Sequence, residues 1–256
     1  MSMINDMIRW LYEINFSETA RTMCIAVAAL AAVFFSVWYG KKIGLSKGKI
    51  FVFLLVAYPI DFLLLEMARI GSTHAATYHV LGIQTLVNAQ LKTFVMISLV
   101  ALLVAKIIKV PWRVTADLLA TANLLNYAIC SIGCLFTGCC FGYPWEYGLY
   151  SPPEQRTVFP IQIVNVIIML LITWYLVRRT KKNGFVSDPK QFPLMLILFG
   201  ATRFVTDFFM DNEKLLFGMS TIALHCIFMI FVGLIAILII EKKNRIKRSP
   251  LCVEKN

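Results

Sequence analysis

The sequence predicts an all-α, polytopic membrane protein with about seven transmembrane helices. Of its 256 residues, 59% are hydrophobic and 15% are charged, whereas charged residues make up about a quarter of ordinary soluble domains. Apolar runs of about 20 residues recur, and each is long enough to cross a hydrocarbon core of roughly 30 Å. We expect spans at 22–40, 50–70, 90–110, 114–136, 159–177, 191–210 and 219–240.

The basic residues predict the orientation of the chain in the membrane. Most of the 25 lysines and arginines follow the first, third, fifth and seventh expected spans. Loops rich in Lys and Arg remain in the cytoplasm, so we expect the N-terminus outside and the C-terminus inside. The net charge of +11 then reflects topology and anionic inner-leaflet lipid, and it does not indicate a nucleic-acid partner.

We expect the chain to form a single integral membrane domain over residues 1–256. An outer amphipathic segment at 1–21 would precede the seven-helix bundle at 22–240, and a basic cytoplasmic tail would occupy 241–256. Apolar residues recur at helical spacing between 3 and 16, which favours a helix lying in the membrane interface. A disordered N-terminal tail is the alternative. No cleavable signal sequence is evident, because no basic region precedes the first span.

Polar residues inside the apolar spans indicate where a functional site lies. Charges at membrane depth are costly, and they usually face the bundle interior or water. At a rise of 1.5 Å per residue, one group from separate spans falls in the outer half of the membrane, and we expect nothing comparable at the cytoplasmic end. The group consists of Arg69, Gln162, Arg203, Asp207 and the glycine-rich segment 133–144.

Arg203 is the most informative of these residues, because its span is otherwise largely apolar. A guanidinium can bind a lipid phosphate through two parallel hydrogen bonds. The alternative is an i, i+4 ion pair with Asp207 that only stabilises the helix. Arg69 has a similar alternative in an i, i+3 pair with Glu66.

The cysteines and histidines do not predict a metal site or a cofactor. Cys130, Cys134, Cys139 and Cys140 surround the glycines without a Cys-x-x-Cys spacing. Their expected outward position permits disulfides, and the sequence leaves their redox state open. His74 and His79 share one loop, but no further metal ligands accompany them.

The segment Gly133-Cys-Leu-Phe-Thr-Gly-Cys-Cys-Phe-Gly-Tyr-Pro144 resembles the signature of bacterial prolipoprotein diacylglyceryl transferases. Further pieces match that family in order along the chain. They are Met67-Ala-Arg69, Asp117-Leu118, Phe159-Pro-Ile-Gln162, Phe199-Gly-Ala-Thr-Arg-Phe-Val-Thr-Asp-Phe-Phe209 and Gly218-Met-Ser-Thr-Ile222. The family's seven spans and its orientation agree with the expectation from the charge pattern.

The resemblance implies a multi-pass enzyme of the bacterial plasma membrane. It would move a diacylglyceryl group from phosphatidylglycerol to the lipobox cysteine thiol of a secreted preprotein. Membrane lipid and the preprotein would be its partners, and it would need no cofactor. The implied catalytic residues are Arg203 and Arg69, and the implied substrate-binding residues are Gln162, Gly133, Gly138, Gly142, Asp207, Ser131 and His79.

The chain also departs from the family pattern. Ser131 stands where the signature has arginine, Met210 replaces the last arginine of the sixth-helix motif, and His79 is a poor counterpart of a His-Gly element. A non-catalytic lipid- or peptide-binding paralogue is therefore the alternative function. A small-solute transporter is disfavoured, because glycine and proline interruptions concentrate in 133–144 and do not recur in both halves.

Overall fold

The computed structural model of the protein describes residues 2–14, 16–73, 89–138, 142–210 and 219–248. Within these ranges it describes the side chains of all residues except 2, 61–73, 89–97, 221 and 245–248.

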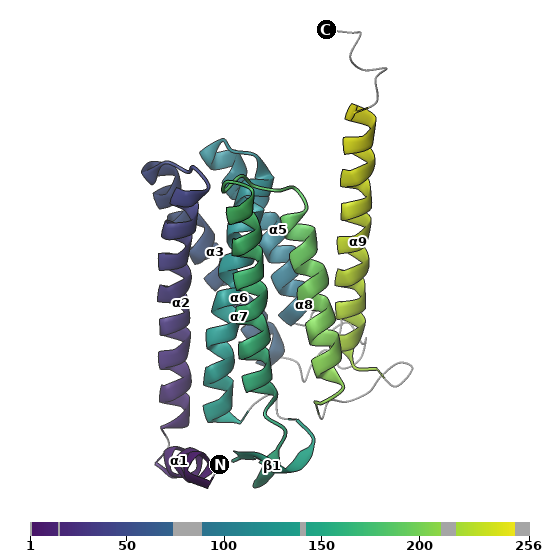
Figure 1. The fold of residues 1–256 in the computed structure, drawn as a ribbon. Helices are drawn as coiled ribbons and strands as arrows, with labels where there is room; N and C mark the ends of the chain where they lie inside the picture. Colours follow the sequence, from purple (N-terminus) through teal and green to yellow (C-terminus); the bar gives the residue numbers. More distant parts are fainter. Residues whose placement is uncertain (1, 15, 74–88, 139–141, 211–218, 249–256) are drawn as a thin grey trace.

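The described chain is mostly helical, as predicted (Figure 1). A helix lies at each of the seven expected spans, and an additional helix precedes them. The helices are α1 (Ser2–Glu13), α2 (Ser17–Lys42), α3 (Lys47–Thr73), α5 (Ala89–Ile108), α6 (Trp112–Thr137), α7 (Ile161–Lys182), α8 (Gln191–Asp207) and α9 (Thr221–Arg248).

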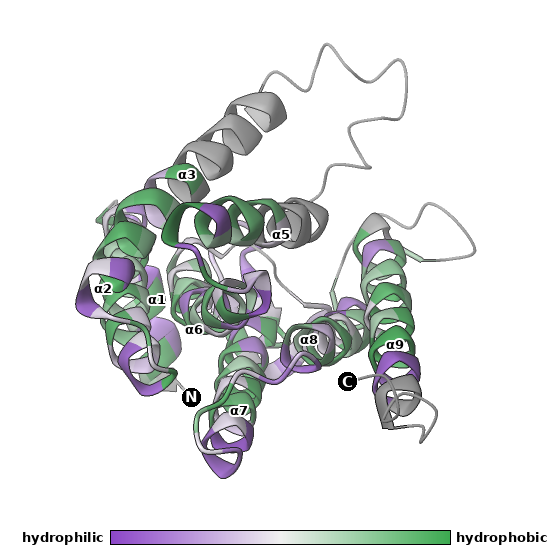
Figure 2. Cartoon of the chain, turned by 90° about the horizontal axis from the view of Figure 1, so that it is seen from above, coloured by the Kyte–Doolittle hydropathy of each residue, from purple (hydrophilic) through white to green (hydrophobic). Residues whose placement is uncertain are grey.

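Four helices in the described part of the chain are long and apolar enough to cross a membrane. They are α2, α6, α7 and the portion Ile222–Asn244 of α9. Large hydrophobic side chains lie on their outer surfaces, including Phe34, Leu171 and Leu238, and the ribbons of these helices are coloured largely as hydrophobic in Figure 2. These features are typical of a mostly helical membrane protein. Membrane crossing by α3, α5 and α8, and the orientation of the termini, stay predictions.

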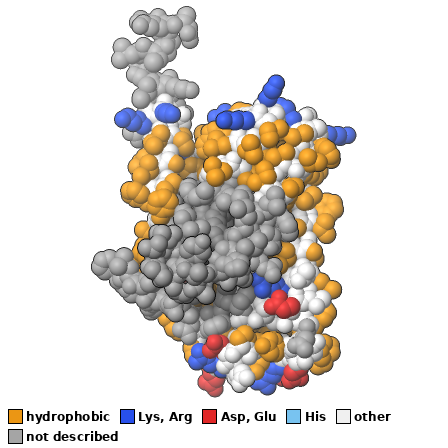
Figure 3. All heavy atoms as spheres, turned by 180° about the vertical axis from the view of Figure 1, so that it is seen from behind, with side chains coloured by type: hydrophobic (Ala, Val, Ile, Leu, Met, Phe, Trp, Pro, Cys, Tyr) orange, Lys and Arg blue, Asp and Glu red, His pale blue; other side chains and the backbone are white. Residues whose placement is uncertain are grey.

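The two ends of the bundle differ in composition. Helices α2, α7 and α9 end at the same side as α6 and α8 begin (Figure 1). We call this side the basic end, because Lys41, Lys42, Lys181 and Lys182 lie in the last turns there. Figure 3 shows Lys and Arg at this end, hydrophobic side chains below it, and charges of both signs at the opposite end. The charge pattern predicts that the basic end is cytoplasmic.

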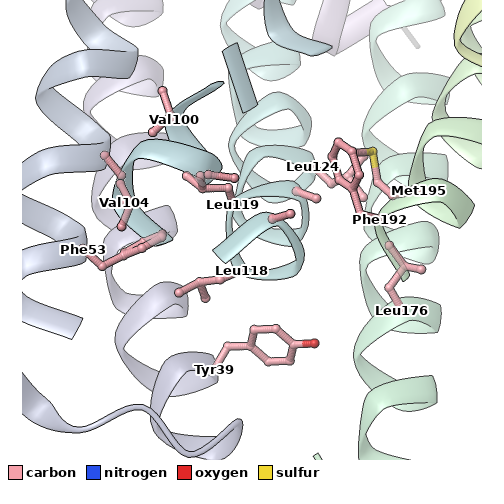
Figure 4. Packing of buried hydrophobic residues seen from close by; sticks show 14 of the residues in the cluster. Tyr39, Phe53, Val100, Val104, Leu118, Leu119, Leu124, Leu176, Phe192 and Met195 are labelled. Atoms are coloured by element: carbon pink, nitrogen blue, oxygen red, sulfur yellow. The ribbon is translucent and has the colours of Figure 1, made fainter. Parts of the chain in front are cut away.

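Helix α6 lies at the centre of the bundle and packs against α2, α5, α7 and α8. Its buried side chains include Ala116, Ala120 and Ala128, and small residues allow helices to approach closely in membranes. Leu118 and Leu124 contribute the larger core side chains of this helix (Figure 4). Helix α6 therefore fixes the positions of its neighbours at both ends.

The opposite end, which we call the cap end, carries α1 and a two-stranded antiparallel sheet formed by β1 (Pro144–Ser151) and β2 (Arg156–Val158). The all-α prediction missed this sheet. Helix α1 is attached to β1 through Asn5, whose Oδ1 accepts from Tyr150 N at 2.9 Å and whose Nδ2 donates to Gly148 O at 3.5 Å. The Arg9 guanidinium lies 4.2 Å from the centroid of the Tyr150 ring. A helix in the N-terminal segment is confirmed, and its place in the membrane interface stays a prediction.

Candidate functional site

The glycine-rich segment begins where α6 ends. Gly138 follows the last helical residue with φ 65° and ψ 17°, the left-handed conformation common at helix C-termini. A Cβ at this position would lie 2.5 Å from Pro153 Cδ and 3.2 Å from Pro152 Cδ. Both the backbone conformation and the lack of space therefore require glycine, and the chain turns here beneath the β1–β2 connection.

Gly142 joins the segment to the ends of two other helices. A Cβ there would lie 2.7 Å from Phe159 O and 2.8 Å from Phe209 O. Next to it, Tyr143 N donates to Phe209 O at 3.0 Å, and Phe159 N donates to Tyr143 O at 2.9 Å. Gly142 also forms an isolated antiparallel bridge with Met210. The segment thus connects the start of α7 to the end of α8 at the cap end.

Gly133 has a different function in the structure. A Cβ on it would lie 3.2 Å from Cys24 Cβ and 3.4 Å from Arg21 Cα, so this glycine allows α6 to pack closely on α2.

The described cysteines Cys24, Cys130, Cys134 and Cys226 are all free thiols. Among the residues that the structure describes, no cluster of three His, Cys, Asp or Glu could hold a metal ion.

Arg203 lies inside the bundle, with only 3% of its surface exposed. Its Cζ is 5.8 Å from the centroid of the Tyr127 ring, and Nη2 is 4.0 Å from Met210 Sδ. Among the residues that the structure describes, Nε and Nη1 have no hydrogen-bond partner. A buried cation without a paired anion costs several kcal/mol, and ring and thioether contacts offset little of that cost. The site therefore presents two unpartnered donors of a fixed positive charge.

Asp207 forms a hydrogen bond with Ser220, and not the ion pair with Arg203 that the alternative interpretation expects. Its Oδ2 accepts a hydrogen bond from Ser220 Oγ at 2.6 Å, and no ion pair with Arg203 is found among the described side chains. Ser220 Oγ also accepts from Ala223 N at 3.1 Å, so it caps the first turn of α9. Asp207 thus links the end of α8 to the start of α9, and none of the described side chains forms an ion pair with Arg203.

The structure brings some of the other predicted residues towards the same end. Gln162, which is buried, lies in the first turn of α7. Ser131, also buried, lies one turn from Tyr127 on α6, and its Oγ donates to Tyr127 O at 2.8 Å. Arg69 falls within α3, but its side chain is outside the described residues, as is the whole of His79. The roles of these residues stay predictions.

Two further buried polar residues at this end were not among the predicted site residues. Asn165 lies one turn from Gln162 on α7, and its Oδ1 has no hydrogen-bond partner in the described part of the chain. His225 is buried in the first turns of α9. Each is an isolated polar residue in an apolar run, and this pattern could have singled them out.

A groove of about 340 Å³ separates the cap-end halves of α7 and α8. Ile161, Val164 and Ile168 line it from α7, and Ala201, Thr202, Val205 and Thr206 line it from α8. Phe159 and Phe209 stand at its end, with ring centroids 5.3 Å apart. The two phenylalanines are the residues whose carbonyl groups contact Gly142, so the glycine-rich segment also holds the mouth of the groove.

The expectation that no polar cluster gathers at the basic end is wrong. Thr180 Oγ1 accepts from Tyr39 Oη at 2.9 Å and from Gln191 Nε2 at 2.8 Å, and all three side chains are buried. Nearby, Ser187 Oγ donates to Oδ2 of the buried Asp117. These residues come from α2, α6, α7, α8 and the α7–α8 connection, so spacing along one helix could not reveal the cluster.

The fold and the buried arginine define a helical membrane protein with a cationic site inside its bundle. A family model for prolipoprotein diacylglyceryl transferase matches residues 22–239, and the chain therefore belongs to that family. The resemblance seen in the glycine-rich signature is confirmed.

The chain is also similar to the phosphatidylglycerol–prolipoprotein diacylglyceryl transferase of Clostridium tetani. The two sequences are 28% identical over 129 residues, which cover 46% of this chain and 50% of the relative. The match thus spans about half the length of this curated relative.

Proposed function

We propose that this protein transfers a diacylglyceryl group from phosphatidylglycerol to the lipobox cysteine thiol of a secreted preprotein. Arg203 carries the proposal, because two donors of this buried cation lack partners within the described part of a chain that belongs to this family. The enzyme would act in the bacterial plasma membrane, with the cap end outside. Arg69 would provide a second cation, and Gln162 would support the bound headgroup.

The proposed chemistry explains the need for a buried cation. A thiolate sulfur would attack the glyceryl carbon that carries the phosphate, and a C–S bond would form as the C–O bond to phosphate breaks. Glycerol phosphate would leave with the electron pair of the broken bond, so negative charge grows on its phosphate. Donors fixed in a water-excluded site stabilise such charge more than they would in water. Nε and Nη1 of Arg203 are donors of this kind.

A non-catalytic lipid- or peptide-binding paralogue is the second candidate, and Ser131 favours it. This residue occupies the position of the signature arginine, and its hydroxyl donates to the backbone of its own helix. Met210 likewise offers Arg203 a thioether sulfur in place of a second cation. Each lost charge-assisted phosphate contact would cost about 3 kcal/mol, or roughly a hundredfold in rate.

One experiment separates the two functions. The full chain would be expressed in cells depleted of their own transferase, and the mass of a lipobox peptide would be measured. We expect a diacylglyceryl mass shift for the natural chain and its loss in Arg203→Ala. Arg156→Ala is the matched control, since this arginine is on the same side of the bundle in β2 and pairs with Glu154. No mass shift at full expression of the natural chain would refute the transferase and support the paralogue.

The variant Ser131→Arg tests the same choice from the opposite direction. Ser131 and Tyr127 are on one face of α6, one turn apart, and Tyr127 already contacts the Arg203 guanidinium. An arginine at 131 would therefore extend towards the same site. We expect Ser131→Arg to transfer faster than the natural chain if the missing cation limits catalysis, and Ser131→Ala to match the natural chain.

A further inference from the structure

We propose that the groove between the cap-end halves of α7 and α8 holds one acyl chain of the glycerophospholipid whose phosphate meets Arg203. This inference rests on the proposed function, because it adds a hydrocarbon subsite to the same lipid site. Three properties of the groove support this assignment: its lining, its surroundings and its distance along α8 from the arginine.

The lining fits hydrocarbon and offers little to a polar ligand. Ile161 and Ile168 are two turns apart on α7, so the α7 wall extends for about 10 Å. On the facing helix, the small side chains of Ala201 and Thr202 leave the space open. Thr202 and Thr206 supply the hydroxyl groups among the lining residues, and Thr206 Oγ1 already donates to Arg203 O at 3.3 Å.

The surroundings of the groove specify lipid as the occupant. Val205 and Phe209, which line it, are 55% and 47% exposed, so the groove opens to the outside of the bundle. Helix α7 is long and apolar enough to cross a membrane. Material in contact with the flank of such a helix is acyl chain, because the bilayer core contains no water to fill an apolar recess.

The mouth of the groove lies at the same level as the cationic end of Arg203. Phe209 stands at the mouth, and the next residue, Met210, contacts Arg203 Nη2 through its sulfur. Trp145 of β1 packs on Phe159 with ring centroids 5.2 Å apart, so aromatic rings surround the mouth on the cap side. A chain inserted through this mouth would therefore place its glyceryl carbons and phosphate near the guanidinium.

Photo-crosslinking of lipid tests the subsite without requiring transfer activity. The full-length protein would be placed in nanodiscs with phosphatidylglycerol that carries a diazirine in the middle of one acyl chain. After illumination, crosslinked peptides would be mapped by mass spectrometry. We expect crosslinks to concentrate on residues 161–168 and 201–209. Labelling spread evenly over all lipid-facing helices, including the exposed Leu234 and Leu238 of α9, would overturn the proposal.

Variants that fill the groove provide the control. Val205→Trp and Ala201→Trp each place an indole in the groove, and each should reduce groove labelling about tenfold, which corresponds to roughly 1.4 kcal/mol. Ile167→Trp adds the same ring to an exposed position of α7 outside the lining, and it should leave labelling unchanged. The two variants keep the test decisive if one of them fails to fold. Unchanged labelling in a groove variant that folds would overturn the proposal.

The same measurement separates this subsite from the proposed transfer reaction. Arg203→Ala should keep the crosslinks in the groove and lose transfer, because it removes the phosphate contact and leaves the hydrocarbon contacts. Crosslinks in the groove of a natural chain that shows no transfer would refute the transferase and retain the acyl-chain subsite. Transfer by a chain whose groove is never labelled would refute the acyl-chain subsite and retain the transferase.

Discussion

The two ends of the bundle both bury polar side chains, and they differ in the kind of group that is left unpaired. At the basic end the unpartnered atoms are acceptors, Asp117 Oδ1 and Gln191 Oε1. At the cap end two of them are donors on a cation, Nε and Nη1 of Arg203. An anionic headgroup can satisfy the second set but not the first. The burial of polar side chains alone therefore does not locate a phosphate site in this fold. The phosphate site is located by whether the unpaired groups are donors on a cation or acceptors.

The surroundings of the two clusters differ as well. The basic-end cluster joins several helices through side-chain hydrogen bonds, and Thr180 Oγ1 both accepts from its neighbours and donates to Leu176 O at 3.1 Å. At the cap end, glycines bring backbone segments together around a charge that the described side chains do not neutralise. We infer that the first cluster stabilises the bundle and that the second retains a costly group for its function.

Arg203→Met should produce the largest contrast between activity and stability. Loss of the cation should lower lipobox modification by about a hundredfold or more, equivalent to roughly 3 kcal/mol. The unfolding midpoint in detergent should stay the same or rise, because replacing an uncompensated buried charge by an apolar side chain of similar length is often neutral or stabilising. A large fall in the unfolding midpoint would show that Arg203 is instead part of the structural framework.

Gly138→Ala should destabilise the cap end more than the same change at a matched turn. Gly138 has φ 65° and Gly184 has φ 67°, but a Cβ at Gly138 would meet Pro153 at 2.5 Å, whereas a Cβ at Gly184 has nothing within 4 Å. The left-handed conformation alone costs about 1–2 kcal/mol for alanine, so Gly184→Ala should lose about that amount. Gly138→Ala should lose clearly more, as measured by chemical unfolding in micelles. Equal losses would mean that Pro153 moves aside.

Removal of one buried hydroxyl group at the basic end should affect stability and spare chemistry. Thr180→Val keeps the shape of the side chain and deprives the buried Tyr39 and Gln191 of their shared partner. The unfolding free energy should fall by about 1–3 kcal/mol, and transfer per folded molecule should be unchanged. A loss of specific activity would show that the two ends are coupled.

Ser220→Ala should have the smallest effect of this series. It removes the cap of α9 and the hydrogen bond to Asp207, and the loss of such a cap costs about 0.5–2 kcal/mol. Ser220→Asp would keep a capping acceptor but place it against a carboxylate, so it should be less stable than Ser220→Ala. The opposite order in thermal unfolding would contradict the assigned Asp207–Ser220 bond.

Sequence reasoning succeeded where the information is local. Apolar runs marked all seven expected helices, and helical rise along the chain placed Arg203 at the correct end of α8. The β-sheet was missed although Trp145, Tyr147 and Tyr150 make this segment rich in aromatic residues before the Pro152 and Pro153 turn, a composition typical of strands.

The remaining features depend on contacts between distant parts of the chain. Ser187 and Asp117 are 70 residues apart, so no periodicity relates them. Asp207 had a plausible partner four residues away in Arg203, and Ser220 on another element binds it instead. The groove exists only because α7 and α8 leave a space between their cap-end halves, which is a property of packing and not of either helix alone.

The contact between Asn5 and β1 has a consequence for how the protein behaves among its own copies. In an extended strand, Gly148 O and Tyr150 N point to the same edge, and the Asn5 carboxamide binds both. One side chain thus supplies the donor and the acceptor that one residue of a parallel neighbouring strand would supply. A strand edge with open hydrogen-bonding groups invites pairing with another molecule. Helix α1 therefore shields this short sheet from strand exchange on the crowded surface of a membrane.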